Sequence, residues 1–123
     1  MILVDTSVWV DHLRKSDEAL AGLLEAGKIL AHPFVIGELA LGNLPRRDLV
    51  LSALHDLPQA SVATDREILH LVDQHLLFGL GIGYVGAHLL AAVLLTAGAG
   101  FWTRDRRIER AADRLGVASA PPG

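Results

Sequence analysis

The sequence contains no cysteine among its 123 residues. This absence excludes disulfide bonds and zinc sites built from thiolates, and it fits a reducing compartment such as the cytoplasm. An excess of basic residues is also missing, since the formal net charge is −3 at pH 7. No overall positive field therefore attracts nucleic acid, and any contact with RNA or DNA has to come from a local cluster of basic side chains.

Charged residues are absent from positions 76–102, a stretch long enough to cross a bilayer. Glycines interrupt this stretch repeatedly, and its most apolar helical part, residues 87–97, is shorter than the roughly 17 residues that a span requires. We therefore expect a buried core helix here and no membrane segment. The N-terminus does not resemble a signal peptide either, because it has no basic start and Asp5 interrupts its apolar run.

Short apolar segments alternate with helical patterns along the whole chain. Strands are expected at 1–4, 28–32, 61–64, 101–104 and 117–119. Helices are expected at 6–14, 16–27, 33–41, 46–57, 64–78, 87–97 and 106–115. This alternation is typical of an α/β layer fold with a mainly parallel sheet, here of about five short strands. We expect a single domain over residues 1–120 and a tail at 121–123.

Three isolated carboxylates stand out as candidates for chemistry. Asp5 directly follows the first expected strand, and Asp105 follows the strand at 101–104. Glu38 is the only charged residue within positions 29–45. A carboxylate in apolar surroundings is costly unless it is paired or bound to a metal. Because few basic residues lie near Asp5 and Glu38, we expect the three acids to converge on one divalent cation, and oxygen-only ligands favour Mg²⁺ or Mn²⁺.

A purely structural role remains open for each acid. Asp5 can cap a helix or lie in a turn, Glu38 can pair with an arginine, and Asp105 can cap the last helix. Three hydroxyl groups lie next to the acids in sequence, at Thr6, Ser7 and Thr103. These hydroxyls can orient carboxylates around a metal, or they can serve only capping and strand packing.

Basic residues are concentrated around the last acid. Five of the eleven lysines and arginines fall within residues 104–114. Arg104 and Arg106 flank Asp105 and are predicted to contact phosphate groups there. The alternative is a solvated helix face, on which Arg106 and Arg110 form ion pairs with acids three residues further along, worth a few tenths of a kcal/mol each.

The segment GIGYVG at 81–86 matches the G-x-G-x-x-G pattern of dinucleotide-binding loops. Such a loop requires a strand immediately before it, whereas the preceding VDQHLLF reads as the end of a helix capped by Thr64. A chain of this length also leaves little room for a separate catalytic half. We therefore expect no nucleotide cofactor at this segment.

Four segments, taken in order, resemble one known family: MILVDTSVW, VIGELALG, GYVGAHLLAA and FWTRDRRI. They resemble the PIN-domain ribonucleases, specifically the VapC toxins of toxin–antitoxin pairs. The resemblance covers essentially the whole chain, and the first and last segments are its most specific parts. It implies a three-layer α/β/α sandwich around a mainly parallel sheet.

The resemblance also implies an activity and a site. In the family, acidic residues hold Mg²⁺ or Mn²⁺, which activates water to cleave RNA phosphodiester bonds. Three positions match the family's first, second and fourth acids: Asp5, Glu38 and Asp105. Three hydroxyls match its supporting positions: Thr6, Ser7 and Thr103. Arg104 and Arg106 then become predicted contacts to RNA.

Partners follow from the same resemblance. Members are usually homodimers, and a cognate VapB antitoxin neutralises them by covering the site with its tail. The complex commonly represses its own operon, with the antitoxin contacting the operator DNA. We therefore expect a cytoplasmic homodimer that meets a VapB-like antitoxin and an RNA substrate, and that meets DNA only through the antitoxin.

One position departs from the family pattern. The family's third acid falls where this chain has Gly86, which removes a negative charge and a ligand oxygen. As a helix cap, glycine costs only a few tenths of a kcal/mol relative to aspartate. We predict a chain that folds but binds metal weakly and cleaves RNA poorly or not at all. The alternative is a non-catalytic PIN-like module that binds an antitoxin or RNA.

Overall fold

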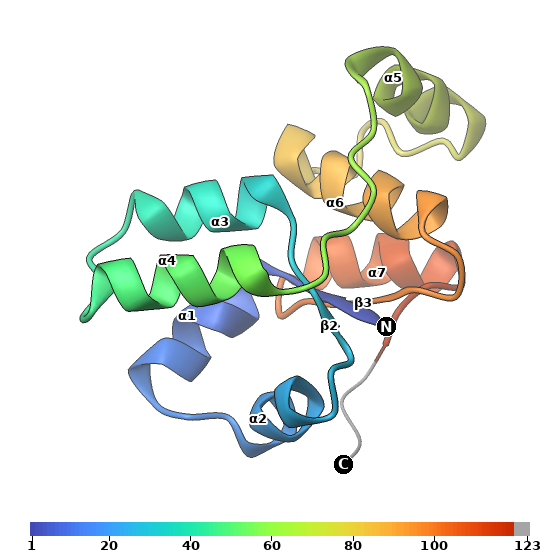
Figure 1. Ribbon diagram of the computed structural model, residues 1–123. Coiled ribbons are helices and arrows are strands. Elements are labelled where there is room, and N and C mark those ends of the chain that lie inside the picture. Colours follow the sequence, from blue (N-terminus) through green and yellow to red (C-terminus); the bar gives the residue numbers. More distant parts are fainter. Residues whose placement is uncertain (120–123) are drawn as a thin grey trace.

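The computed structural model describes residues 1–119. Strands and helices alternate along this part of the chain, and helices lie on both sides of the strands (Figure 1). The elements are β1 (Ile2–Val4), α1 (Thr6–Arg14), α2 (Glu18–Glu25), β2 (Ile29–Leu30), α3 (Pro33–Ala40), α4 (Arg47–Asp56), α5 (Asp65–Gln74), α6 (Gly83–Leu95), β3 (Gly100–Trp102) and α7 (Arg106–Arg114).

The sheet is parallel and has the strand order β2-β1-β3. Leu3 in the central strand is paired with Leu30 on one side and with Phe101 on the other. The chain thus adds β2 to one edge of β1 and β3 to the opposite edge. In open parallel sheets, the carboxyl ends of strands flanking such a reversal border a crevice where ligands bind. The predicted α/β class with a parallel sheet is confirmed.

The predicted number of strands is wrong, because residues 1–119 contain three strands and not five. The segment 61–64 is extended but unpaired: Gln59 forms a single bridge with Ala31, and the chain then turns into α5. The segment 117–119 forms one bridge, between Ala118 and Phe101. Within residues 1–119, neither segment has a neighbouring strand alongside it for more than one bridge. The predicted tail at 121–123 lies outside the described residues.

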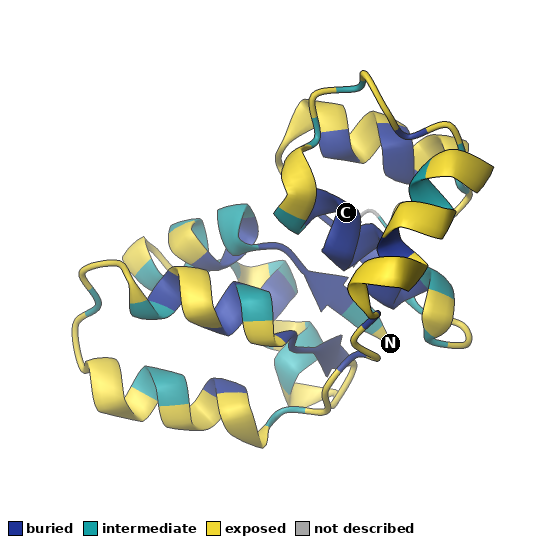
Figure 2. Cartoon of the chain, turned by 90° about the horizontal axis from the view of Figure 1, so that it is seen from above, coloured by how far each residue is buried: buried dark blue, intermediate teal, exposed yellow. Residues whose placement is uncertain are grey.

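The stretch without charged residues forms the core helix that the sequence predicts. Every residue from Gly86 to Val93 in α6 is buried, and Leu89 and Leu90 are fully so. Figure 2 shows buried residues gathered along the strands and α6, whereas α4 is largely exposed. Within residues 1–119, no helix has both the length and the apolar character that a membrane span needs.

Local sequence signals predict one helix start correctly, but not the end of that helix or the start of α6. Thr64 and Glu67 form the predicted capping box of α5, which ends at Gln74 and not near Phe78. The helix expected from residue 87 begins at Gly83 instead. Glycine is a poor helix former, but packing of an apolar face outweighs the roughly 1 kcal/mol that a glycine costs in a helix.

Candidate catalytic site

Asp5 occupies the carboxyl end of the central strand and is 7% exposed. Its backbone N–H donates to the Trp102 carbonyl at 2.9 Å, so Asp5 lies beside the end of β3. One carboxylate oxygen, Oδ1, accepts from the Thr6 N–H at 2.8 Å and caps α1. The other, Oδ2, accepts from Ser7 Oγ at 2.9 Å and Thr103 Oγ1 at 2.7 Å. Hydrogen bonds alone stabilise this buried charge.

Glu38 reaches the same place from α3. Its Oε1 accepts a hydrogen bond of 2.7 Å from Thr6 Oγ1. The predicted alternative, in which Glu38 pairs with an arginine, is wrong, since no basic side chain within residues 1–119 lies within 4.0 Å of it. Thr6 thus connects the acid of α3 to the first turn of α1.

Asp105 is the N-cap of α7. This agrees with the alternative prediction that Asp105 caps the last helix. Its Oδ1 accepts from the N–H groups of Arg107 at 2.9 Å and Ile108 at 3.1 Å. Its own N–H donates to Thr103 Oγ1 at 3.0 Å. Because Thr103 also donates to Asp5, one hydroxyl joins the acids at the ends of β1 and β3. The capping role leaves Oδ2 free of hydrogen bonds to the described residues.

The three predicted acids therefore share one hydrogen-bonded network, through the backbone N–H and hydroxyl of Thr6 and through the hydroxyl of Thr103. None of the three has a lysine, arginine or histidine partner in the part of the chain that the structure describes. They do not form a ready-made metal cluster, however: residues 1–119 contain no group of three or more histidine, aspartate or glutamate side chains that could hold one ion. The network gathers the acids without bringing all of them to a common ligand distance.

Gly86 lies near the start of α6 and is buried against α7. A Cβ atom at this position would lie 3.1 Å from Ile108 Cδ1, 3.4 Å from Ile108 Cγ1 and 3.7 Å from Ile82 Cβ. The tightest of these contacts is to the far end of a flexible side chain. An aspartate fits here if the Ile108 side chain shifts by a few tenths of an ångström.

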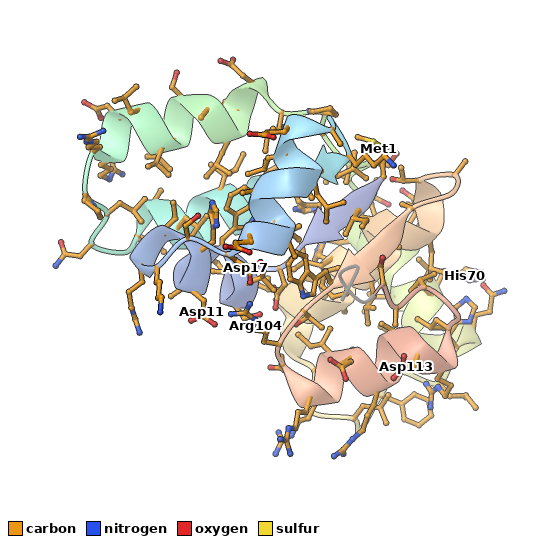
Figure 3. All side chains as sticks on the ribbon, turned by 90° about the horizontal axis from the view of Figure 1, so that it is seen from below. Met1, Asp11, Asp17, His70, Arg104 and Asp113 are labelled. Atoms are coloured by element: carbon orange, nitrogen blue, oxygen red, sulfur yellow. The ribbon has the colours of Figure 1, made fainter. Side chains whose placement is uncertain are left out.

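Arg104 fastens the end of β3 to the N-terminal helices. Its guanidinium nitrogens pair with Asp11 in α1 and, at 2.8 Å, with Asp17, the N-cap of α2 (Figure 3). The Leu20 N–H and Arg104 hold the pKa of Asp17 below its ordinary value. With both nitrogens engaged by carboxylates, Arg104 is a poor candidate for the predicted RNA contact. The sequence contains no signal for this pairing across 93 and 87 positions.

Two buried histidines join the helices that carry Glu38 and Gly86. His32 caps α3 by accepting from the Phe34 N–H at 3.0 Å. Phe34 packs on His88 of α6 with ring centroids 4.4 Å apart. Burial, together with the charge that His88 can carry, lowers the pKa of His32 to about 4. The position of His32 directly before Pro33 is a capping signal that sequence reasoning overlooked.

The glycine-rich segment is not a nucleotide loop. Residues 65–74 form α5, and no strand leads into Gly81. The requirement that a strand precede G-x-G-x-x-G is thus unmet, as the sequence predicts.

A groove of about 550 Å³ opens beside Glu38, between α1 and the end of α3. Its lining is mainly apolar: Val10, Leu13, Arg14, Glu38, Leu39, Gly42, Asn43, Leu44 and Pro45. Val10 in this lining is exposed on the surface. The groove therefore places exposed apolar surface next to one of the acids.

Comparison with known proteins identifies the family of this chain. The family model described as the PIN domain matches residues 2–114. Two relatives, each named Ribonuclease VapC32, come from Mycobacterium tuberculosis strains CDC 1551 / Oshkosh and ATCC 25618 / H37Rv. Each is 50% identical over 120 residues, which cover 98% of this chain and 97% of the relative. The chain therefore belongs to the PIN-domain family, among its VapC ribonuclease toxins.

Proposed function

We propose that this chain has the active-site framework of a VapC-type endoribonuclease that depends on Mg²⁺ or Mn²⁺, and that Gly86 impairs it. The observation that carries the proposal is the hydrogen-bonded network around Asp5, which is buried and has no cationic partner in residues 1–119. Thr6 links it to Glu38, through its N–H on Asp5 and its hydroxyl on Glu38. The Thr103 hydroxyl links it to the backbone N–H of Asp105. A buried carboxylate without a counter-charge is expensive, and a bound cation would offset that cost.

The donor set suits a hard divalent cation. All the candidate ligands are carboxylate oxygens, and neither sulfur nor imidazole is among them. Glu38 Oε2 and Asp105 Oδ2 accept no hydrogen bond from residues 1–119, and Asp5 Oδ1 keeps a lone pair beyond the bond from Thr6. These three oxygens are the ligands that the acids offer to an ion, although they do not lie at a common ligand distance. When bound, such a cation supplies a Lewis acid and lowers the pKa of water at the site.

The chain's own groups have separate tasks in this proposal. The hydroxyls of Ser7 and Thr103 fix the rotamer of Asp5. Thr6 holds Glu38 against α1. Asp105, fixed by two N–H groups of α7, keeps its other oxygen turned away from the helix backbone. RNA would then be cut at a phosphodiester placed between these acids.

Gly86 explains why we propose an impaired enzyme. The three acids alone do not reach a common ligand distance. A fourth carboxylate, on α6 beside the first turn of α7, would add a negative charge and an oxygen on the side where the site has none. Without it, metal affinity falls, because each hard ligand contributes to holding the ion.

RNA cleavage by two variants tests this proposal. Gly86→Asp adds the carboxylate, and Gly86→Asn adds a side chain of nearly the same shape without the charge. We expect Gly86→Asp to cleave RNA in Mg²⁺ or Mn²⁺ at least about a hundredfold faster than the parent chain, and Gly86→Asn to match the parent. Parent activity equal to that of Gly86→Asp contradicts the impairment. Absence of cleavage by every variant favours the alternative, a non-catalytic module that binds antitoxin or RNA.

The groove beside Glu38 supports a VapB-like antitoxin as the protein partner. An antitoxin tail that covers the site must lie next to the acids, and this groove is apolar along most of its length and ends at Glu38. An apolar segment with one basic residue would complement both features. We expect Leu44→Glu to weaken the complex with the cognate antitoxin. Operator DNA would be contacted by the antitoxin.

A homodimer in the cytoplasm completes the proposal. Exposed apolar side chains on and after α5 support self-association: Leu69 is 60% exposed, Leu76 60% and Phe78 62%. Covering such side chains is the usual driving force for association. Sedimentation of the parent chain and of Phe78→Ser tests it, since a dimer held by this surface dissociates in the variant.

A further inference from the structure

The last helix carries charges of opposite sign on two neighbouring strips of its surface. At 100° per residue, Arg106, Arg107, Arg110 and Arg114 fall within about 100° of the α7 circumference. Glu109 and Asp113 lie on a different strip, where they line a hollow next to β3. The ion pairs predicted from sequence between these groups are not formed: no carboxylate of residues 1–119 lies within 4.0 Å of Arg106 or Arg110.

A second hollow lies on the basic side of α7. It measures about 190 Å³ and is lined by Leu80, Arg107, Arg110, Ala111 and Arg114. At about 30 Å³ for each water molecule, this volume admits a phosphate group with part of its sugar. Its walls offer guanidinium groups for phosphate oxygens and the Leu80 side chain for the apolar edge of a ribose.

Two contacts hold this hollow in shape. Arg114 Nη2 donates to the carbonyls of His75 at 2.7 Å and Leu76 at 3.0 Å, which ties the turn after α5 to the end of α7. The Arg107 side chain lies over Gly81, where a Cβ would come within 2.7 Å of Arg107 Nη1 and 3.2 Å of its Cδ. Gly81, with φ +72°, therefore leaves the room that the guanidinium occupies.

The hollow and the proposed cleavage site are connected by α7. Asp105 caps this helix and accepts the Arg107 N–H, whereas the Arg107 side chain lies over Gly81. Arg110 follows Asp105 by five residues, or about 7.5 Å along the helix axis. A phosphate bound in the hollow therefore belongs to a part of the RNA outside the acids.

We propose that Arg107 and Arg110 bind an RNA backbone phosphate outside the acids, in the hollow lined also by Leu80 and Arg114. The inference rests on the proposed ribonuclease function and adds a binding site for substrate outside the acids. Neither guanidinium has a carboxylate partner in residues 1–119, so both are available to an anion. Arginine suits this role because its planar fork presents paired donors to phosphate oxygens.

The test is RNA binding by the double variant Arg107→Gln/Arg110→Gln, followed by fluorescence anisotropy of a labelled oligouridylate. EDTA is present, so that binding is measured apart from cleavage. We expect affinity to fall at least about tenfold near 0.1 M salt. The slope of log K against log salt concentration should become shallower by about 0.7, because one phosphate on a single strand is no longer neutralised by the protein.

A charge-matched control separates a specific site from a general field. Lys15→Gln/Lys28→Gln also removes two positive charges, from the C-cap of α1 and from the turn before β2. We expect this variant to keep the parent affinity and salt slope. Circular dichroism and a thermal melt verify that both double variants remain folded.

Three outcomes overturn the inference. Parent-like affinity and slope in Arg107→Gln/Arg110→Gln would do so, as would equal losses in the control variant. So would intact RNA binding together with a weakened antitoxin complex, because the hollow would then hold an acidic segment of the antitoxin. The proposed ribonuclease function is judged separately, by cleavage in the Gly86→Asp chain, and it survives all three.

Discussion

The starts of α1 and α6 both adjoin the first turn of α7, yet they differ in what they present to a ligand. At α1, Asp5 is a buried carboxylate with donors on both oxygens. At α6, the atoms nearest a side chain added at Gly86 are carbons of Ile108 and Ile82. Asp5 is thus surrounded by hydrogen-bond donors, whereas a carboxylate at position 86 would have carbon atoms as its nearest neighbours. We therefore regard the site as complete on one side and open on the other.

The largest effect on RNA cleavage is expected from replacing Asp5, at the start of α1. In the Gly86→Asp chain, Asp5→Asn should reduce RNA cleavage by about a thousandfold, because it removes the buried negative charge that would bind the metal. It should also lower the free energy of unfolding by about 2–3 kcal/mol, since it replaces charge-assisted hydrogen bonds by weaker neutral ones. Cleavage assays and urea denaturation measure the two effects.

Asp48→Asn serves as the control for this change. Asp48 is an exposed carboxylate in the first turn of α4, outside the network of hydrogen-bonded acids. We expect its variant to retain activity and stability. Undiminished cleavage by Asp5→Asn would remove Asp5 from the catalytic centre.

The stability of the packing between α3 and α6, where His32 and His88 are buried, should depend on pH. Burial and the adjacent His88 hold the pKa of His32 at about 4 in the folded protein, against about 6.5 in the unfolded chain. The unfolded chain therefore binds more protons between these values, so the contribution of His32 is complete above about pH 6.5 and is lost as pH falls towards 4. We expect the free energy of unfolding to fall by about 3 kcal/mol over that range from this group.

His32→Asn tests this, because asparagine keeps an N-cap acceptor and does not titrate. Urea denaturation from pH 7 to about pH 4.5 should show a shallower loss for His32→Asn than for the parent. His55→Asn, at an exposed position in α4, should follow the parent curve. Identical slopes in parent and His32→Asn would show that His32 is not the cause.

A smaller effect is expected at the hydroxyl between Asp5 and Asp105. Thr103→Val keeps the shape of a residue that is 5% exposed but removes its donor to Asp5 and its acceptor for Asp105. The cost should be about 2 kcal/mol of unfolding free energy, because polar groups are left without partners. Thr103→Ser retains both hydrogen bonds and should cost about 1 kcal/mol, for the methyl group alone. Equal costs for the two variants would show that the hydroxyl bonds contribute little.

The positions of the acids in the fold are predictable because Asp5 and Asp105 follow apolar segments and Glu38 is the one charge within an apolar helix. A strand end and a helix cap are local features, so the neighbours in sequence suffice to place Asp5, Asp105 and Thr64. The bonds that join the acids are not local: Thr6 and Glu38 are 32 positions apart, and Thr103 and Asp5 are 98. The three hydroxyl positions follow from the sequence, but their partners do not.

The wrong predictions share a physical cause. Sequence pattern reports whether a segment is apolar and extended, but not whether a neighbour is present to pair with it. Residues 61–64 are extended without a ladder, and 117–119 pair at a single bridge. The prediction that Arg104 contacts phosphate rests on its charge and its place next to Asp105, whereas the fold places Asp11 and Asp17 around its guanidinium.

Metal affinity tests the difference between the two sides most directly. Calorimetric titration of Mn²⁺ into the parent, Gly86→Asp and Gly86→Asn chains compares an open position with a charged and an uncharged side chain. We predict that Gly86→Asp binds Mn²⁺ at least about tenfold more tightly than the parent, and that Gly86→Asn binds as the parent does. Equal affinity of the parent and Gly86→Asp would contradict the account, because the site would then already be complete without a carboxylate on α6.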